Sequence, residues 1–256
     1  MISVRDLTFS YDAKPVLEHL SFSVPEGGLT ALLGCNGTGK TTLFRCMLGI
    51  QPHYSGEIDL DGRELRQYSA SQLASKIAYI PQNHYPAFNY SVLDMVLMGT
   101  TQQLRAFASP GPKQIRLAEE AMARLGISAL SYRDYMHLSG GEKQLVLIAR
   151  ALAQQAPILL MDEPTASLDF GNQLRVMDQV RQLSHSGYTV VMSTHNPQHA
   201  LSYCDRVLAL KSGRVQADGT PEDVIDEALM EALYSVSVQF EDTSCGRIIM
   251  AASGHK

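Results

Sequence analysis

Apolar and polar residues alternate along the first part of the chain, over Ile2–Ser10 and Leu20–Val24. Such alternation is typical of antiparallel strands with one buried face. Further along, apolar residues occur in short continuous runs bounded by turns or by helical patterns. These runs indicate strands that are buried on both faces of a largely parallel sheet. They are Leu29–Leu33, Ile77–Ile80, Ile158–Met161 and Thr189–Met192.

Helical periodicity fills the segments between these runs. From about 86 to 154 helical patterns dominate, so we predict a helical subdomain inserted into an α/β core. A strand pattern returns as a hairpin over 205–211 and 214–218, and a second hairpin is predicted from Val236–Phe240 and Arg247–Ala251. The predicted helices are Lys40–Leu48, Ser91–Met98, Lys113–Leu125, Gly140–Gln154, Asn172–Leu183 and Pro197–Tyr203.

Composition and charge exclude several classes of protein. The 256 residues include 21 Lys and Arg against 26 Asp and Glu, a net charge of −5, and no two basic residues are adjacent. A nucleic acid partner is therefore not expected. No apolar run approaches the roughly 20 residues that cross a bilayer, and no secretory signal opens the sequence. The cysteines lack metal-type spacing, which suggests reduced thiols in an intracellular protein.

A phosphate-binding motif follows the run Leu29–Leu33. The segment Gly34–Thr41 matches G-x-x-x-x-G-K-[ST] and leads into a predicted helix, whereas a simple helix-capping turn would not require Lys and Thr. Its backbone N–H groups and helix dipole favour an anion. Lys40 is expected to reach the β- and γ-phosphates, and Thr41 to ligate Mg²⁺. The nucleotide contacts are assigned to Gly34, Cys35, Asn36, Gly37, Thr38, Gly39, Lys40, Thr41 and Thr42.

Two adjacent carboxylates end the run that begins at Ile158. A buried strand that delivers acids at its carboxyl end places them at the edge of an α/β sheet, where ligands bind. Asp162 is predicted to hold Mg²⁺, and Glu163 is predicted to be the base that polarises the attacking water. The alternative is a pair of solvated surface acids, which the phosphate motif disfavours.

The segment Leu138–Glu142 reads Leu-Ser-Gly-Gly-Glu and resembles the signature motif of ABC-type ATPases. Ser139 and Glu142 also have the spacing of a capping box, and the two readings are compatible because a capped helix N-terminus binds anions. Glu142 stands where the family more often has Gln. The resemblance implies contact with the γ-phosphate of an ATP held by a second subunit, through Ser139, Gly140, Gly141 and Glu142.

Further segments of the chain resemble the other motifs of this family and follow one another in the same order as in the family. The resemblance implies that Tyr11 stacks on adenine and that Gln82 joins the Mg²⁺ site. It also implies that Asp169 belongs to a loop crossing the dimer interface and that His195 contacts the γ-phosphate. Taken alone, the Tyr or the His would be read as structural. The implied Mg²⁺ ligands are Thr41, Gln82 and Asp162, and the implied catalytic residues are Lys40, Glu163 and His195.

The resemblance covers residues 2 to about 235. It implies a P-loop NTPase core of the RecA-like kind, in an ABC ATP-binding domain over 1–235 with its helical subdomain at about 86–154. Residues 236–256 are then a short C-terminal extension. Because the chain holds one phosphate loop and one signature, we expect two copies to close head to tail around two ATP molecules.

Within this family, Pro81–Gly99 resembles the importers of metal chelates such as iron-siderophores, haem and cobalamin. The resemblance implies that about 82–99 receives a helix of a separate permease, with Tyr85, Phe88 and Tyr90 at the contact. The subunit would lie at the cytoplasmic face of the inner or plasma membrane, and a substrate-binding protein would act indirectly. The transported molecule is not encoded here, because this chain does not touch it.

Other function classes remain as alternatives. These are the ATPase subunit of another ABC importer or of a separate-subunit exporter, and a soluble ABC-type ATPase acting on ribosomes or DNA. A P-loop GTPase or small-molecule kinase is disfavoured, because no Asn is followed by Lys as an Asn-Lys-x-Asp guanine motif requires.

Overall fold

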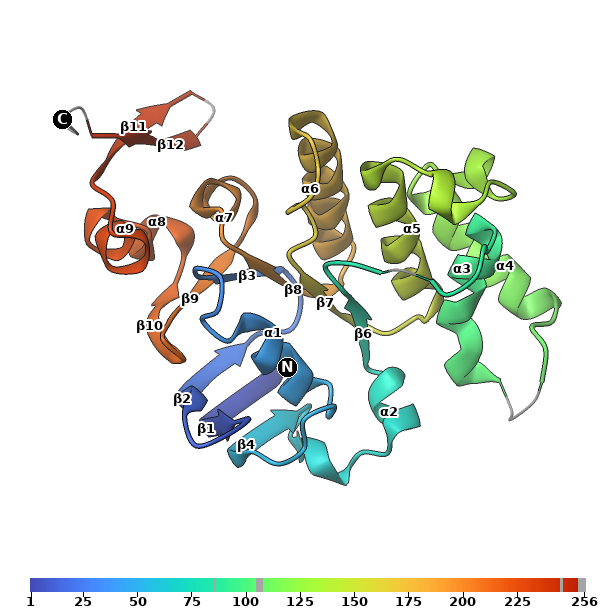
Figure 1. Cartoon of the computed structure of the whole chain (residues 1–256), viewed down its shortest axis with the longest axis horizontal. Helices are drawn as coiled ribbons and strands as arrows, with labels where there is room; N and C mark the ends of the chain where they lie inside the picture. The colour runs from blue at the N-terminus through green and yellow to red at the C-terminus, as the bar shows by residue number, and fades with distance from the viewer. Residues whose placement is uncertain (85, 105–107, 245, 253–256) are drawn as a thin grey trace.

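The computed structural model describes residues 1–84, 86–104, 108–244 and 246–252. Within these ranges a mostly parallel sheet lies at the centre, an antiparallel sheet lies below it in Figure 1, and helices flank the central sheet. This is the predicted α/β class, and the predicted N-terminal antiparallel β subdomain is confirmed.

The central sheet has the strand order β10-β9-β3-β8-β7-β6 in the described part of the chain. β10 closes one edge in the antiparallel direction, and the other strands run parallel. Every residue of β3, β7 and β8 is buried, which explains their continuous apolar runs. The bounds are β3 Leu29–Leu33, β6 Ile77–Ile80, β7 Ile158–Asp162, β8 Thr189–Thr194, β9 Arg206–Lys211 and β10 Arg214–Gly219.

The antiparallel sheet has the order β2-β1-β4-β5, counted over the described residues. The sequence pattern does not predict β4. Its buried apolar positions are only Ile58 and Leu60, and the carboxylates of Glu57 and Asp59 in the same strand reach Arg5 on β1. β2 also begins at Pro15, before the predicted start. The bounds are β1 Ile2–Ser10, β2 Pro15–Val24, β4 Ser55–Leu60 and β5 Arg63–Glu64.

Between β6 and β7 the chain forms the helices α3, α4 and α5, which pack against one another at the right of Figure 1. The predicted inserted helical subdomain is therefore confirmed, while its limits at about 86 and 154 and the division at 235 remain predictions. Short 3₁₀ turns connect these helices. The bounds are α3 Val92–Leu97, η2 Met98–Gln103, α4 Pro112–Arg124, η3 Ser128–Leu130, η4 Tyr135–His137 and α5 Gly140–Ala153.

The remaining helices lie outside the helical subdomain, before β6 or after β7 in the chain. The sequence pattern does not predict α2, α8 or α9, each of which is eight residues long or shorter. The C-terminal hairpin β11-β12 is confirmed. The bounds are α1 Lys40–Met47, η1 Leu65–Gln67, α2 Ala70–Ala74, α6 Phe170–His185, α7 Pro197–Tyr203, α8 Pro221–Val224, α9 Glu227–Tyr234, β11 Val238–Thr243 and β12 Gly246–Ala251.

Side chains of the central sheet alternate between two hydrophobic cores. Leu29, Ala31 and Leu33 of β3 belong to the core shared with α3–α7, whereas Leu32 belongs to the core shared with α1 and the antiparallel sheet. The loops that follow the carboxyl ends of the parallel strands carry the site. Among the described residues, no helix combines the length and the apolar character that crossing a bilayer requires.

Candidate nucleotide-binding and hydrolysis site

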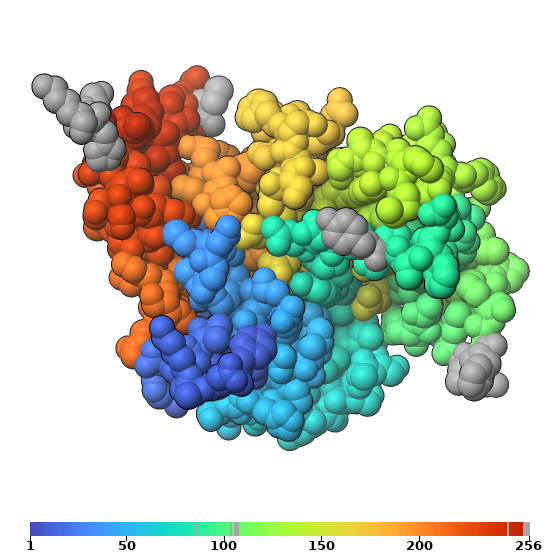
Figure 2. Space-filling model, in the orientation of Figure 1, coloured from blue at the N-terminus to red at the C-terminus, as the bar shows by residue number. Residues whose placement is uncertain are grey.

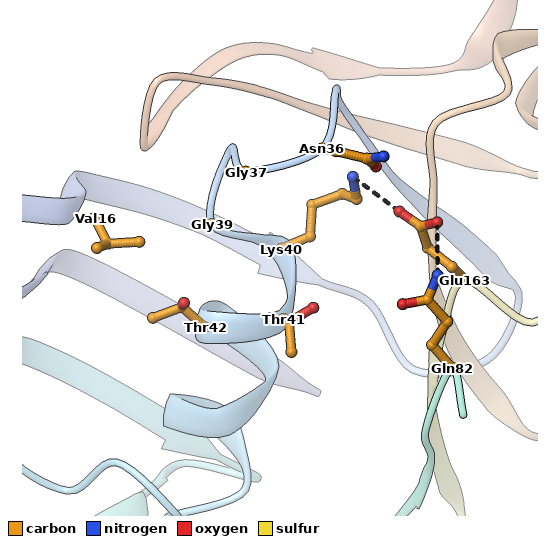
Figure 3. Close-up of a pocket in the computed structure, with 9 residues that line it drawn as sticks. All are labelled: Val16, Asn36, Gly37, Gly39, Lys40, Thr41, Thr42, Gln82 and Glu163. Carbon is orange, nitrogen blue, oxygen red and sulfur yellow. Dashed lines mark hydrogen bonds and ion pairs between the residues drawn. The ribbon is translucent and has the colours of Figure 1, made fainter. Parts of the chain in front are cut away.

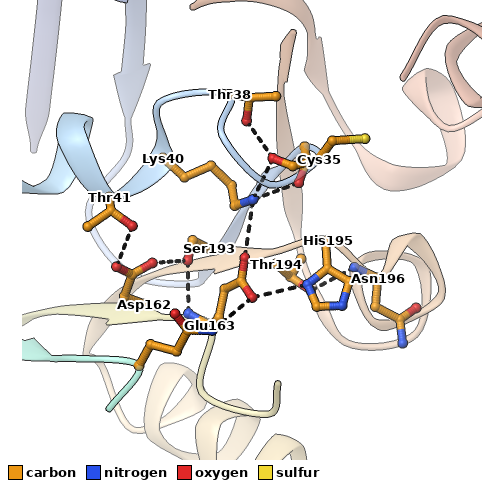
Figure 4. A network of polar contacts seen from close by, with 12 residues as sticks. Cys35, Thr38, Lys40, Thr41, Asp162, Glu163, Ser193, Thr194, His195 and Asn196 are labelled. Carbon is orange, nitrogen blue, oxygen red and sulfur yellow. Dashed lines mark hydrogen bonds and ion pairs between the residues drawn. The ribbon is translucent and has the colours of Figure 1, made fainter. Parts of the chain in front are cut away.

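The loop between β3 and α1 wraps around the side chain of Lys40. The Lys40 ammonium donates to the backbone oxygens of Gly34, at 2.7 Å, and Cys35, at 3.0 Å (Figure 4). Gly39, at φ 101°, precedes the helix, and a Cβ on it would lie 2.7 Å from Leu17 Cδ2. No side chain in the described residues caps the N-terminus of α1, so its N–H groups remain available to an anion.

A cavity of about 380 Å³ opens beside this loop, within the usual size range of ligand sites (Figure 3). It brings Gln82 and Glu163, predicted from distant motifs, to the phosphate loop. Val16, on β2, also lines it, although the sequence pattern assigned Val16 no role. The lining residues are Val16, Asn36, Gly37, Gly39, Lys40, Thr41, Thr42, Gln82 and Glu163.

Asp162 lies beneath the cavity with its carboxylate held by hydroxyl groups. It is 3% exposed and accepts hydrogen bonds from Thr41 at 2.7 Å, Ser193 at 2.6 Å and Tyr79 at 3.2 Å. Burial beside this carboxylate raises the pKa of Tyr79, so its hydroxyl stays a donor. The Thr41 hydroxyl and the Asp162 carboxylate thus form an adjacent pair of hard oxygen donors, which fits the ligand preference of Mg²⁺.

Glu163 connects the elements of the site. Its buried carboxylate lies 3.2 Å from Lys40 Nζ and 3.1 Å from His195 Nδ1, and the Gln82 amide donates to it at 3.4 Å. Its backbone adopts φ 45°, a left-handed conformation that is rare for a non-glycine residue, and its N–H donates to Ser193 at 2.9 Å. Such strain persists where surrounding contacts enforce it, typically at functional sites.

Ser193 is a site residue that the sequence reasoning missed. It lies directly opposite Asp162 in the pairing of β7 with β8, is fully buried, and bonds both Asp162 Oδ1 and the Glu163 N–H. The signal that would have found it is the adjacency of β7 and β8, which no local pattern reveals.

Replacing Ser193 by Ala is expected to lower the free energy of unfolding by about 1–3 kcal/mol, because two buried polar groups lose their partner. Thermal or denaturant unfolding measures this. Ser184→Ala is the matched control, since the buried Ser184 hydroxyl donates to a helix carbonyl, that of Arg181, outside the site. If both variants unfolded alike, Ser193 would have no special role.

His195 and Tyr11 are less enclosed than the residues around Lys40. His195 follows β8, and half of its side chain is exposed on the rim beside Glu163. Tyr11 is 49% exposed, makes an edge contact with Phe9, and accepts a hydrogen bond from Arg45 at 3.2 Å. Tyr11 is not among the lining residues of the cavity, so its contact with adenine remains a prediction.

The predicted signature segment caps α5. Ser139 and Glu142 form a reciprocal capping box, and the Ser139 bonds lower the pKa of Glu142. A Cβ on Gly141 would lie 2.4 Å from Asn172 Oδ1, near the start of α6, which Asp169 caps. None of the signature residues lines the cavity of its own phosphate loop. The capping-box reading is thus confirmed, and contact with nucleotide remains a prediction.

The segment that leads into α3 carries exposed aromatic residues. Phe88 is 71% exposed and meets Tyr90 edge to face, while Tyr85 lies outside the described residues. The Tyr135 N–H donates to Tyr90 O at 3.0 Å, which places the segment 131–136 beside 88–91. Tyr132, 88% exposed, extends this surface, a contribution that the sequence reasoning missed.

Together, the strand–loop–helix cradle and the acids at the ends of parallel strands define a P-loop nucleoside triphosphatase. A family model described as ABC transporter matches residues 17–166. The chain belongs to the ABC transporter family, whose ATP-binding subunits bind and hydrolyse ATP.

Individual relatives agree with this assignment. The chain is 44% identical to an uncharacterized ABC transporter ATP-binding protein of Haemophilus influenzae, over 82% of this chain and 80% of that protein. It is 36% identical to the "Probable iron chelatin transport ATP-binding protein" of Helicobacter pylori, over 93% and 94%. A solved chain from an inward-facing ABC transporter assigned to the metal-chelate type has a TM-score of 0.86 at 31% identity, covering 98% and 96%.

Proposed function

We propose that this chain is the ATP-hydrolysing subunit of an importer for a metal chelate. The observation that carries the catalytic part is Glu163, which is held between Lys40 and His195 beside the phosphate loop. The names of its relatives, which include iron chelatin and hemin transport proteins, support the importer part and the class of cargo.

In the proposed reaction Lys40 binds the β- and γ-phosphates, which requires its ion pair with Glu163 to open. The freed Glu163 carboxylate accepts a proton from the attacking water. His195, which bonds Glu163 at 3.1 Å, keeps that carboxylate oriented and faces the γ-phosphate. Mg²⁺, held by Thr41, Asp162 and Gln82, would neutralise charge on the phosphate oxygens.

ATP-binding cassettes of this family form dimers, and in importers they pair with permease subunits. We infer that two copies of this chain close head to tail. The support is that Ser139 caps a helix whose first residues, Gly140 and Gly141, do not line the cavity of the chain's own phosphate loop, so this helix N-terminus can meet a phosphate from another copy. Asp169, at the start of α6, then lies at the contact between the copies.

The permease contact is proposed for residues 82–99, with Phe88 and Tyr90 at its centre. Aromatic residues are enriched in protein interfaces. Among the described residues, Tyr90 is the ring that Phe88 contacts, and most of Phe88 is exposed. The subunit would then be peripheral at the cytoplasmic face of the inner or plasma membrane. A substrate-binding protein would act on the permease rather than on this chain.

Phe88→Asp is expected to lower coupled transport by about 30-fold, since losing an interface anchor costs about 2 kcal/mol or more. Basal ATP hydrolysis of the isolated subunit should persist, because Phe88 lies outside the cavity. Transport into proteoliposomes and ATPase of the free subunit measure the two effects. Ile50→Asp is the control, since Ile50 is 59% exposed beyond α1. Equal loss of both activities in Phe88→Asp would count against docking.

The importer assignment itself is tested by co-purification from native membranes with the tagged full chain. The expected result is a membrane-spanning permease in the complex, with ATP hydrolysis stimulated by one metal chelate and its binding protein. Stimulation by a sugar or an amino acid instead would overturn the cargo class. Recovery of ribosomes or DNA in place of a permease would overturn the importer.

A further inference from the structure

The end of α9 lies between the phosphate loop and the segment that carries His195. The Cys35 thiol donates to the backbone oxygen of Leu233 at 3.0 Å, and the Tyr234 hydroxyl donates to the backbone oxygen of His195 at 2.9 Å. Two side-chain hydrogen bonds therefore connect three segments that are far apart in the sequence. Residues 227–234 lie beyond the 17–166 region that the family model matches.

α9 is firmly packed and so is able to hold these segments in place. Leu229, Met230 and Leu233 are buried in the core shared with β3 and α7. Ser235 ends the helix at φ 57°, directly after Tyr234. In Figure 2 the C-terminal residues, drawn in red, lie directly against the orange residues that follow β8.

The Tyr234 hydroxyl remains a hydrogen-bond donor under working conditions. Burial, together with the nearby Cys35 and Glu163, raises the pKa of Tyr234. The protonated form is therefore retained at neutral pH, and the bond to His195 O persists.

A second contact from the C-terminal region reaches the same segment. The Gln198 amide, in the first turn of α7, donates to Arg247 O at 3.1 Å and accepts from the Ile249 N–H at 3.0 Å. The hairpin β11-β12 is thus hydrogen-bonded to α7, which begins two residues after His195. Tyr234 and the hairpin β11-β12 therefore contact the segment that follows β8 through separate hydrogen bonds.

We propose that Tyr234 is a positioning residue for ATP hydrolysis, which sets the place of His195 relative to Glu163 by bonding its backbone, while Cys35 holds α9 against the phosphate loop. The inference rests on the proposed hydrolytic function. Because small displacements of a reacting group cost much rate, loss of this bond lowers kcat. ATP binding is spared, because the bonds of Lys40 to Gly34 and Cys35 do not involve Tyr234.

The test is Tyr234→Phe in the purified full chain with Mg-ATP, which removes the hydroxyl and keeps the ring. The expected result is a kcat lowered about 3- to 10-fold, the loss of one hydrogen bond, with KM for ATP changed less than about twofold. Tyr68→Phe is the matched control. The Tyr68 hydroxyl also donates to a backbone oxygen, that of Leu60, at 2.8 Å, but does so in the antiparallel sheet. Its kcat should equal that of the unmodified chain.

A double-mutant cycle separates positioning from a purely structural role. In a His195→Ala background, Tyr234→Phe should add no further loss of kcat, because the group that it positions is gone. The same fold-loss in both backgrounds, or an unchanged kcat for the single variant, would overturn the proposal. The hydrolytic part of the proposed function is judged separately: it stands if the unmodified chain hydrolyses ATP and Glu163→Gln does so far more slowly, whatever Tyr234→Phe does.

Discussion

Glu163→Gln is expected to slow ATP hydrolysis by about 10²- to 10⁴-fold, the usual contribution of a general base. The amide keeps the shape of the side chain but does not accept a proton from water. Binding of ATP should be retained, because Lys40 keeps its bonds to the loop carbonyls and loses a competing carboxylate. We therefore expect the variant to accumulate as an ATP-bound dimer, visible by size-exclusion chromatography with light scattering.

The control for this variant is Glu57→Gln, a neutral replacement at a surface carboxylate that pairs with Arg5. Exposed ion pairs of this kind contribute little, so its ATPase rate should match that of the unmodified chain. Unchanged hydrolysis in Glu163→Gln would remove Glu163 from the base role. A variant that stayed monomeric at saturating Mg-ATP would refute the head-to-tail dimer.

Lys40→Ala is expected to weaken ATP binding by at least about 30-fold, and hydrolysis should fall with it. Removing one partner of a buried, hydrogen-bonded charge pair costs about 2–5 kcal/mol, and each 1.4 kcal/mol is a factor of ten. Among the described residues that line the cavity, Lys40 carries the one positive charge, so no neighbour replaces it. Titration with a fluorescent ATP analogue measures the dissociation constant.

Lys76→Ala is the matched control for this second variant, because Lys76 also pairs with a carboxylate, that of Asp61, but at the surface of the antiparallel sheet. Its affinity for the analogue should equal that of the unmodified chain. Near-normal binding by Lys40→Ala would mean that the cavity is not the phosphate site. Equal loss in both variants would point to general unfolding, which circular dichroism would reveal.

Much of the fold was predictable because its signals are local. The strands β3, β7 and β8 are buried on both faces and are therefore continuous apolar runs, and the glycine spacing before Lys40 is confined to eight residues. β4 escaped prediction, since half of its side chains face solvent and Arg5. α9 was also not predicted, although α1, of the same length, was.

The sequence by itself determined the phosphate loop, the paired carboxylates and the capped signature helix, because each is written in neighbouring residues. Tertiary structure alone decided how they meet. The order of strands in the central sheet sets Ser193 opposite Asp162 and brings Glu163 between Lys40 and His195. Packing of α9 then places Tyr234 behind His195. Contacts between residues so distant along the chain depend on the pairing and packing of whole elements, which no local pattern encodes.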